Sequence, residues 1–209
     1  MKTAKINYFW CAKNCKGFLS NKQKITILVI LVIILAFILS LVFDHQILNF
    51  FLMLRTKTGI SLDFVEKDII IYPAILIVQL VFILIQSNGW KNGKKQILYF
   101  IMSVIITVLI TTLLRAIIPR ERPFPSQHKL GKEIFLDKNS FPSGHTALTF
   151  TLFPFIKNKV LVWIWTIFVI FIMISRLWNG MHYASDVIAG AVIGFIVPFL
   201  FLKIIKKIK

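Results

Sequence analysis

Six stretches of this chain consist almost entirely of apolar residues, and polar segments of different lengths separate them. They are Ile25–Phe43, Ile69–Ile85, Ile97–Leu114, Thr146–Ile156, Val160–Ile174 and Val187–Leu202. The first holds no charged residue in 19 positions, and a run of about 18 apolar residues is long enough to cross a bilayer as a helix. The pattern therefore predicts an all-α, polytopic membrane protein, a bundle of six transmembrane helices.

The start of the chain is polar and basic, which divides the sequence into a cytoplasmic segment, 1–24, and a six-span domain, 25–209. A cleaved signal peptide is the alternative for the first apolar stretch. It would need an apolar core of about 7–15 residues and a small-residue cleavage site. Here the core has 19 residues and Phe43-Asp44-His45-Gln46 follows it, so we expect a retained span.

The net charge of +17 reflects an uneven distribution of charge. Basic chains can bind nucleic acid, but here the charges follow the predicted loops. With the N-terminus in the cytoplasm, six spans place fifteen of the 25 Lys and Arg residues, and none of the eight carboxylates, on the cytoplasmic side. Short loops rich in Lys and Arg stay cytoplasmic. Both termini are therefore predicted to be cytoplasmic, with anionic lipid heads as partners and no nucleic acid.

The two cysteines, Cys11 and Cys15, lie in the basic N-terminal segment. No further metal-binding side chain lies near them in the sequence. We expect two reduced thiols, with neither a metal site nor a disulfide.

Two segments on the predicted outer side differ from simple loops. The segment 45–68 mixes apolar and basic residues, and either a helix on the membrane surface or a connection packed on the bundle would fit. The segment 119–141 holds three prolines, the first being Pro119. Because proline disfavours helix at the preceding residue, the third helix should end near Ile118, with Arg115 in its last turn.

Three polar clusters each lie at the outer end of a predicted span. They are Arg115-Ala-Ile-Ile-Pro-Arg-Glu-Arg122-Pro123, Phe141-Pro142-Ser143-Gly144-His145, and Ser175-Arg176-Leu-Trp-Asn-Gly-Met-His182-Tyr-Ala-Ser-Asp186. Alone, each has an ordinary structural explanation: an arginine reaching lipid heads, a serine capping a helix, a His–Asp pair on one helical face. The topology brings all three to one membrane face, where ionisable groups are functional by default. A joint site at the extracytoplasmic end of the bundle follows.

The clusters resemble the three-part signature of the type 2 phosphatidic acid phosphatase superfamily, K/R-x6-R-P, P-S-G-H and S-R-x5-H-x3-D. The chain matches every position, with Arg115 where the family more often carries Lys. The match covers Arg115–Asp186 directly, and the six-span layout extends it to nearly the whole chain. The resemblance implies a membrane lipid phosphatase that hydrolyses phosphoric esters or diphosphates without a metal.

The residue types suit a phosphate, which carries close to two negative charges on three oxygens. Guanidinium groups bind such oxygens bidentately, which makes Arg115, Arg122 and Arg176 candidates for holding the phosphate. A helix beginning at Ser143 would add backbone donors, and Gly144 would let the backbone approach closely.

The resemblance also implies a histidine nucleophile. His182 would attack phosphorus and form a phosphohistidine, while Asp186, one helical turn on, holds the other ring nitrogen. His145 would protonate the departing group and later activate water. No cofactor or metal is expected, because Mg²⁺ sites favour carboxylates and only Asp186 belongs to the clusters. Glu121 is expected to form a salt bridge with the arginines that flank it.

The substrates that the resemblance implies are undecaprenyl pyrophosphate, phosphatidylglycerol phosphate, phosphatidic acid and the phosphates of lipid A. No residue chooses among them. The alternatives are a phosphotransferase that passes the phosphoryl group to another lipid, and a non-enzymatic membrane protein with a relic site. A haloperoxidase, which has similar site residues, fits a lipid-embedded site less well. We expect an inner bacterial membrane, with the site facing outward.

Overall fold

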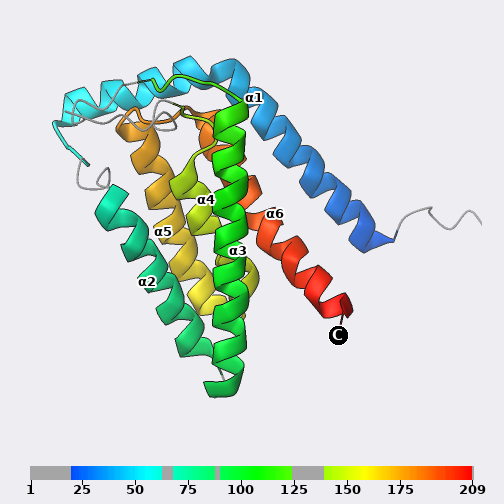
Figure 1. The fold of residues 1–209 in the computed structure, drawn as a ribbon. Coiled ribbons are helices and arrows are strands. Elements are labelled where there is room, and N and C mark those ends of the chain that lie inside the picture. The colour runs from blue at the N-terminus through cyan, green and yellow to red at the C-terminus, as the bar shows by residue number, and fades with distance from the viewer. Residues whose placement is uncertain (1–19, 63–67, 88–89, 124–138, 209) are drawn as a thin grey trace, which may run out of the picture. The chain divides into compact units, whose positions relative to one another are not determined.

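The structure, a computed structural model, describes residues 20–62, 68–87, 90–123 and 139–208. This part of the chain is all-α, as predicted, with six α-helices and one short 3₁₀ helix (Figure 1). They are α1 (Asn21–Thr58), α2 (Asp68–Gln86), α3 (Trp90–Ile117), α4 (Gly144–Phe150), η3 (Phe153–Phe155), α5 (Lys159–Trp178) and α6 (Ala184–Ile208). Both cysteines, most of the segment 1–24 and much of the segment 119–141 lie outside the described residues.

Four of these helices are long and apolar enough to cross a membrane. The spans are Gln23–Thr58, Gly93–Ile117, Lys159–Trp178 and Ala184–Lys207, and α2 adds a shorter apolar stretch, Ile70–Gln86. Many of their large apolar side chains are exposed, up to 71% for Trp163. Water would not tolerate so large an apolar surface, whereas lipid does. The chain is therefore an integral membrane protein, with four candidate spans in its described part.

The chain divides into two compact units, Met1–Leu39 and Ser40–Lys209. In the first unit the described residues form the start of α1. The helix opens with a capping box: the hydroxyl of Ser20 accepts from the Gln23 amide at 3.3 Å, and the Ser20 amide donates to the Gln23 side chain at 2.8 Å. These two bonds satisfy amides that the first helical turn leaves without a carbonyl partner.

The rest of α1 belongs to the second unit and contributes buried side chains to it. Of the segment 45–68, the residues up to Thr58 are helical. Leu48 and, one turn earlier, Asp44 are buried there. This half of α1 therefore packs within the second unit. Its buried carboxylate, Asp44, contacts residues of the candidate active site described below.

Helix α4 lies at the centre of the second unit, where it contacts α2, α3, α5 and α6. Its closest neighbour is α6, on which Gly190 and Gly194 lie one turn apart. A Cβ atom on Gly190 would overlap the carbonyl oxygen of Ser143, and one on Gly194 would overlap that of Ala147. Small residues at this spacing let two helices meet at backbone distance. The two glycines therefore fix the position of α4.

The continuous fourth helix predicted over Thr146–Ile156 is replaced by α4, a turn and η3. Pro154 lies inside η3, and its missing amide prevents a regular α-helix there. A helix that ends inside the protein leaves its last carbonyls without partners. Buried side chains satisfy them: Gln79 donates to the Leu148 carbonyl at 2.8 Å, and Trp165 donates to the Thr149 carbonyl at 2.9 Å.

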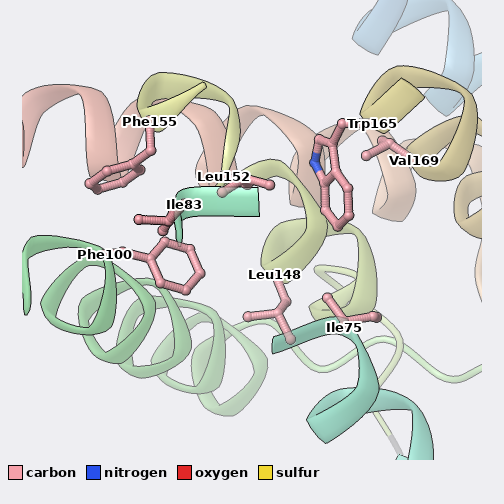
Figure 2. Packing of buried hydrophobic residues seen from close by; sticks show 8 residues of the cluster. All are labelled: Ile75, Ile83, Phe100, Leu148, Leu152, Phe155, Trp165 and Val169. Atoms are coloured by element: carbon pink, nitrogen blue, oxygen red, sulfur yellow. The ribbon is translucent and has the colours of Figure 1, made fainter. Parts of the chain in front are cut away.

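A hydrophobic core packs around this broken helix (Figure 2). Its buried members come from α2, α3, α4, η3, α5 and the turn after α4, and they are Ile75, Ile83, Phe100, Leu148, Leu152, Phe155, Trp165 and Val169. The core therefore supports the segment that carries the second polar cluster.

Candidate active site

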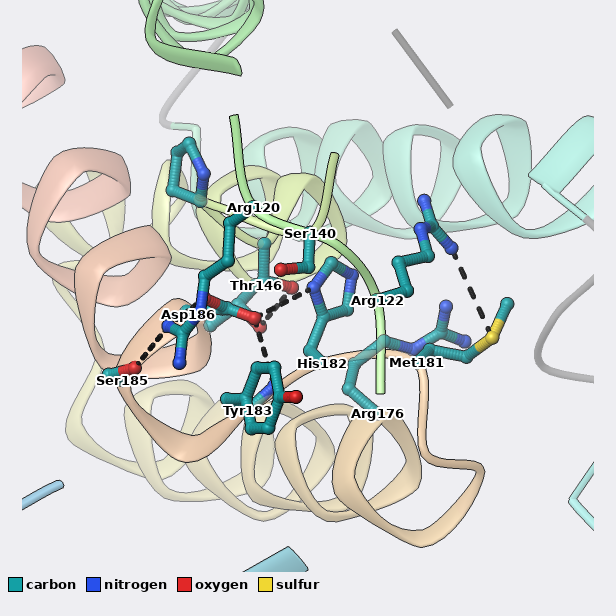
Figure 3. A network of polar contacts seen from close by, with 12 residues as sticks. Arg120, Arg122, Ser140, Thr146, Arg176, Met181, His182, Tyr183, Ser185 and Asp186 are labelled. Atoms are coloured by element: carbon teal, nitrogen blue, oxygen red, sulfur yellow. Dashed lines mark hydrogen bonds and ion pairs between the residues drawn. The ribbon is translucent and has the colours of Figure 1, made fainter. Parts of the chain in front are cut away.

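The residues predicted for the site come from four parts of the chain that meet in the second unit (Figure 3). Arg115 lies in the last turn of α3, which ends at Ile117, close to the predicted boundary. Arg176 lies in the last turn of α5, and Asp186 lies in the first turn of α6. His145 is the second residue of α4.

The turn between α5 and α6 aims its residues at this point. Gly180 has φ +65°, and its amide donates to the Leu177 carbonyl at 3.0 Å. The Met181 amide donates to the Arg176 carbonyl at 3.1 Å. This is the Schellman arrangement that ends a helix at a left-handed glycine. It satisfies the final carbonyls of α5 and reverses the chain just before His182.

His182 and Asp186 differ from the predicted pair on one helical face, because α6 begins at Ala184. The carboxylate of Asp186 instead reaches back and accepts a hydrogen bond from the Tyr183 amide at 2.9 Å, as an acidic residue does in a capping box. The same oxygen, Oδ2, lies 3.7 Å from Nδ1 of His182. The cap therefore turns Asp186 toward the imidazole and leaves Nε2 of His182 for other partners.

Arg176 and His145 form a second buried pair. Nη1 of Arg176, a residue only 1% exposed, lies 3.3 Å from Nδ1 of His145. A guanidinium can only donate, so Nδ1 accepts and the proton of the neutral imidazole lies on Nε2. The ring of Tyr72, from α2, stacks on that of His145 with 4.1 Å between centroids. The tautomer and the plane of His145 are both held.

Arg115 crosses the start of α4. Its Nε donates to the Pro142 carbonyl at 3.2 Å, and its own carbonyl accepts from the Asn139 side chain at 2.6 Å. A Cβ atom on Gly144 would lie 2.7 Å from Nη2 of Arg115 and 2.8 Å from the hydroxyl of Tyr72. The side chains of Arg115 and Tyr72 thus lie directly against the backbone at Gly144, and the close approach of this backbone to a phosphate stays a prediction.

Arg122 completes the group of arginines that the sequence predicts. Its Nη1 lies 4.0 Å from the sulfur of Met181, so it faces the turn that carries His182. Burial lowers the pKa of the His182 imidazole from 6.5 to about 4; the charges of Arg122 and Arg115 add to this, and Asp186 acts against it. His182 is therefore neutral near pH 7, as a nucleophile has to be.

Ser143 occupies the predicted N-cap position of α4, but its side chain makes no cap bond. Its hydroxyl instead accepts from Thr146 at 3.0 Å, and its amide donates to the Asp186 carbonyl at 3.0 Å. The predicted helix cap is therefore wrong, because the serine is engaged by neighbouring groups. Its amide joins the second cluster to the third.

Two residues that sequence reasoning did not assign to the site lie at its edge. Arg120 donates to Asp44 at 2.7 Å and to Asp186 at 2.6 Å. Two buried carboxylates thus hold the guanidinium of Arg120, whereas the predicted salt bridge of Glu121 with its flanking arginines stays a prediction. Asp44 could have been noticed as a charged residue directly after a 19-residue apolar run. Its pairing with Arg120 could not, since the two residues lie 76 positions apart in the chain.

The described residues hold no group of three His, Cys, Asp or Glu side chains that could bind a metal ion. What they bring together is a set of arginines around two imidazoles, at the ends of apolar helices. Such a set binds an anion with several oxygens and offers a ring nitrogen to it. The fold and the site together define a helical membrane protein built to handle phosphate groups.

Comparison with known proteins agrees. Residues 96–209 match the PAP2 superfamily, more than half of the chain, and the protein belongs to that family. The predicted resemblance is thereby confirmed.

Individual relatives are similar over shorter stretches. The chain is 45% identical over 58 residues to the bacitracin transport permease protein BcrC of Bacillus licheniformis, covering 27% of this chain and 29% of that one. It is 38% identical over 66 residues to the undecaprenyl-diphosphatase BcrC of Bacillus subtilis, covering 31% and 34%. The matches thus span about a third of those relatives.

Two solved structures align with parts of this chain. The PAP2-type phosphatidylglycerolphosphate phosphatase of Bacillus subtilis has a TM-score of 0.51 at 21% identity, covering 86% of this chain and 96% of that one. LpxE of Aquifex aeolicus has a TM-score of 0.47 at 25% identity, covering 62% and 77%. The first of these supports the transmembrane fold.

Proposed function

We propose that this protein is a lipid phosphatase that cleaves a phosphate monoester or pyrophosphate through a phosphohistidine on His182. The observation that carries the proposal is the meeting of Arg115, Arg122 and Arg176 with His145 and His182 in one place. Phosphoryl transfer requires chiefly positioning and charge stabilisation, and three guanidinium groups provide both. Family membership adds the reaction class.

In the first step Nε2 of His182 forms a bond to phosphorus while the bond from phosphorus to the leaving oxygen breaks. Nδ1 of His182 keeps its proton and faces Oδ2 of Asp186 at 3.7 Å, so the growing positive charge lies beside a carboxylate. His145 gives a proton to the leaving oxygen. In the second step His145 takes a proton from water, the water oxygen bonds to phosphorus and the P–N bond breaks.

Proton donation requires His145 to be protonated on both ring nitrogens. Arg176 occupies Nδ1 in the structure, so its guanidinium has to turn away. A bound phosphate offers that guanidinium two charged oxygens in place of one ring nitrogen, which is the stronger bond. Binding of substrate thus prepares the acid, and Ser143 and Gly144 complete the proposed phosphate site.

The proposed substrate is a lipid because the site adjoins an apolar pocket. The pocket has a volume of ≈ 250 Å³, lies between α5 and α6 and reaches Ala184, two residues after His182. It is lined by aliphatic and thioether side chains, namely Ile170, Met173, Ile174, Leu177, Ala184, Val187 and Ile188. An alkyl or prenyl tail fits such a lining.

Among the candidate substrates we rank undecaprenyl pyrophosphate first, because one relative, 38% identical over 66 residues, is an undecaprenyl-diphosphatase. Phosphatidylglycerol phosphate, phosphatidic acid and the phosphates of lipid A are the other candidates. We propose six spans in a bacterial inner membrane, with α2 and the α4–η3 pair completing the four long helices. Both termini are cytoplasmic in this proposal, and the site faces outward.

The test is phosphate release by the purified protein in detergent against the four lipids, without any acceptor. His182→Ala should abolish release while the protein stays folded. A hydrolase releases free phosphate without an acceptor. A phosphotransferase would release none and would instead form a phosphorylated acceptor lipid when one is added, and a relic site would do neither. Normal turnover by His182→Ala would refute the nucleophile.

A further inference from the structure

Asp44, a buried carboxylate in α1, accepts hydrogen bonds from Arg120 and Ser185, the two residues that lie beside Asp186. Asp44 is 2% exposed. Its Oδ1 accepts from the Ser185 amide at 2.9 Å, and its Oδ2 accepts from the Ser185 hydroxyl and from Nη2 of Arg120 at 2.7 Å. Both of its oxygens are thus satisfied, as a buried carboxylate requires.

Arg120 continues these contacts to the proposed catalytic histidine. Its Nη1 donates to Oδ1 of Asp186 at 2.6 Å and to the hydroxyl of Ser185 at 2.6 Å. Its guanidinium also lies 4.2 Å from the centre of the Tyr183 ring. The fork therefore joins Asp44 to Asp186, whose other oxygen faces Nδ1 of His182 at 3.7 Å.

Within the group formed by Asp44, Arg120 and Asp186, the charges are unequal in number. The two aspartates are negative and Arg120 is positive, so these three side chains together carry one net negative charge on the side of His182 opposite the phosphate-binding arginines. An ion pair of Arg120 with Asp186 alone would be neutral and would leave an imidazolium at His182 uncompensated in a buried site, where unpaired charge is costly. Asp44 shares the guanidinium and thereby leaves the negative charge in place.

We propose that Asp44 and Arg120 are positioning residues of the reaction, which aim Asp186 at His182 and keep the net charge that stabilises the phosphohistidine. This rests on the proposed function, since it assigns no substrate contact to either residue. The two act through Asp186. Their removal should lower kcat and leave KM unchanged, because the phosphate site itself is intact.

Variants that neutralise one charge at a time distinguish this role from a packing role. Asp44→Asn removes the net negative charge. Arg120→Gln in the same chain restores it, because only Asp186 then remains charged. Arg120→Gln should therefore lower kcat in the parent protein but raise it in the Asp44→Asn background. Loss of a structural ion pair would instead lower kcat in both.

The experiment measures kcat and KM for phosphate release from undecaprenyl pyrophosphate and phosphatidic acid in detergent micelles, with thermal unfolding of each variant. Asp44→Asn should lower kcat about 10- to 100-fold, the loss typical of groups that orient a functional side chain from behind, with KM within about twofold. Ser40→Ala, buried one turn earlier on α1, is the matched control and should keep the parent kcat.

Arg120→Lys is the second variant and decides the matter if Asp44→Asn does not fold. A lysine keeps the charge, but its single ammonium cannot hold two carboxylates as a fork does. A folded Arg120→Lys with the parent kcat would overturn the proposal, as would a folded Asp44→Asn equal to Ser40→Ala. His182→Ala separates the two levels: if it is inactive while these variants are normal, only the positioning role fails, whereas an active His182→Ala refutes the proposed function.

Discussion

Gly144→Ala tests whether Arg115 binds the phosphate. A Cβ atom at this position would lie 2.7 Å from Nη2 of Arg115, whereas ordinary contact begins at 3.4 Å. The guanidinium, the far end of a flexible side chain, should therefore shift by about 0.7 Å at little cost in stability. Such a shift is large for a charge-assisted hydrogen bond, whose length varies by only a few tenths of an ångström.

The size of the effect follows from the bonds at stake. A hydrogen bond to a charged group contributes about 1.5–3 kcal/mol, and every 1.4 kcal/mol is roughly tenfold in an equilibrium constant. Loss of one Arg115–phosphate bond should therefore lower kcat/KM by about 10- to 100-fold. The hydroxyl of Tyr72, 2.8 Å from the same methyl position, should shift as well.

The assay is phosphate release under kcat/KM conditions, with inhibition by inorganic phosphate as a measure of binding. Gly93→Ala is the matched control: it adds the same methyl group near the opposite end of α3, 3.0 Å from the hydroxyl of Ser87. The control should retain the parent kcat/KM. A Gly144→Ala protein with parent kcat/KM and parent inhibition by phosphate would refute the role of Arg115.

Three further predictions concern protonation, metal and packing. NMR titration of ring-labelled histidines, assigned with His182→Ala, should place the pKa of His182 near 4, because burial disfavours its charged form; a midpoint at 6.5 or above would contradict the buried site. Treatment with EDTA should leave phosphate release unchanged, and loss that Mg²⁺ restores would mean that a metal takes part. Gly194→Ala should lower the thermal midpoint in detergent through an overlap with the Ala147 carbonyl that costs about 1–3 kcal/mol; an unchanged midpoint would mean that α4 and α6 separate freely.

The apolar pattern predicts the helices well because lipid requires long helical apolar segments. The third helix ends at Ile117 since the proline-rich segment follows it. The fourth stretch is predicted less well. The break at Pro154 depends on partners elsewhere in the chain, such as Gln79, whose side chain donates to the Leu148 carbonyl near the break.

The site is predictable as far as local sequence signals reach. The three clusters identify the arginines and histidines because each cluster lies at an end of a helix: the first at the end of α3, the second at the start of α4 and the third between α5 and α6. The side-chain cap by Ser143 is mispredicted. The Ser143 hydroxyl accepts a hydrogen bond from the Thr146 hydroxyl, and the Ser143 amide donates to the Asp186 carbonyl. The partners of Asp44 and Tyr72 are beyond sequence reasoning: the two residues lie on separate helices, and only packing brings them to Arg120 and His145.

The match to the PAP2 superfamily begins at residue 96, yet two groups at the polar centre lie before it. Tyr72 stacks on His145 from α2, and Asp44 reaches Arg120 from α1. A chimera that joins residues 96–209 to the N-terminal helices of another member would carry all three signature clusters. It would still lack these two side chains unless the other member places equivalent residues at the same positions. In an exchange between relatives, α1 and α2 therefore have to be transferred together with residues 96–209.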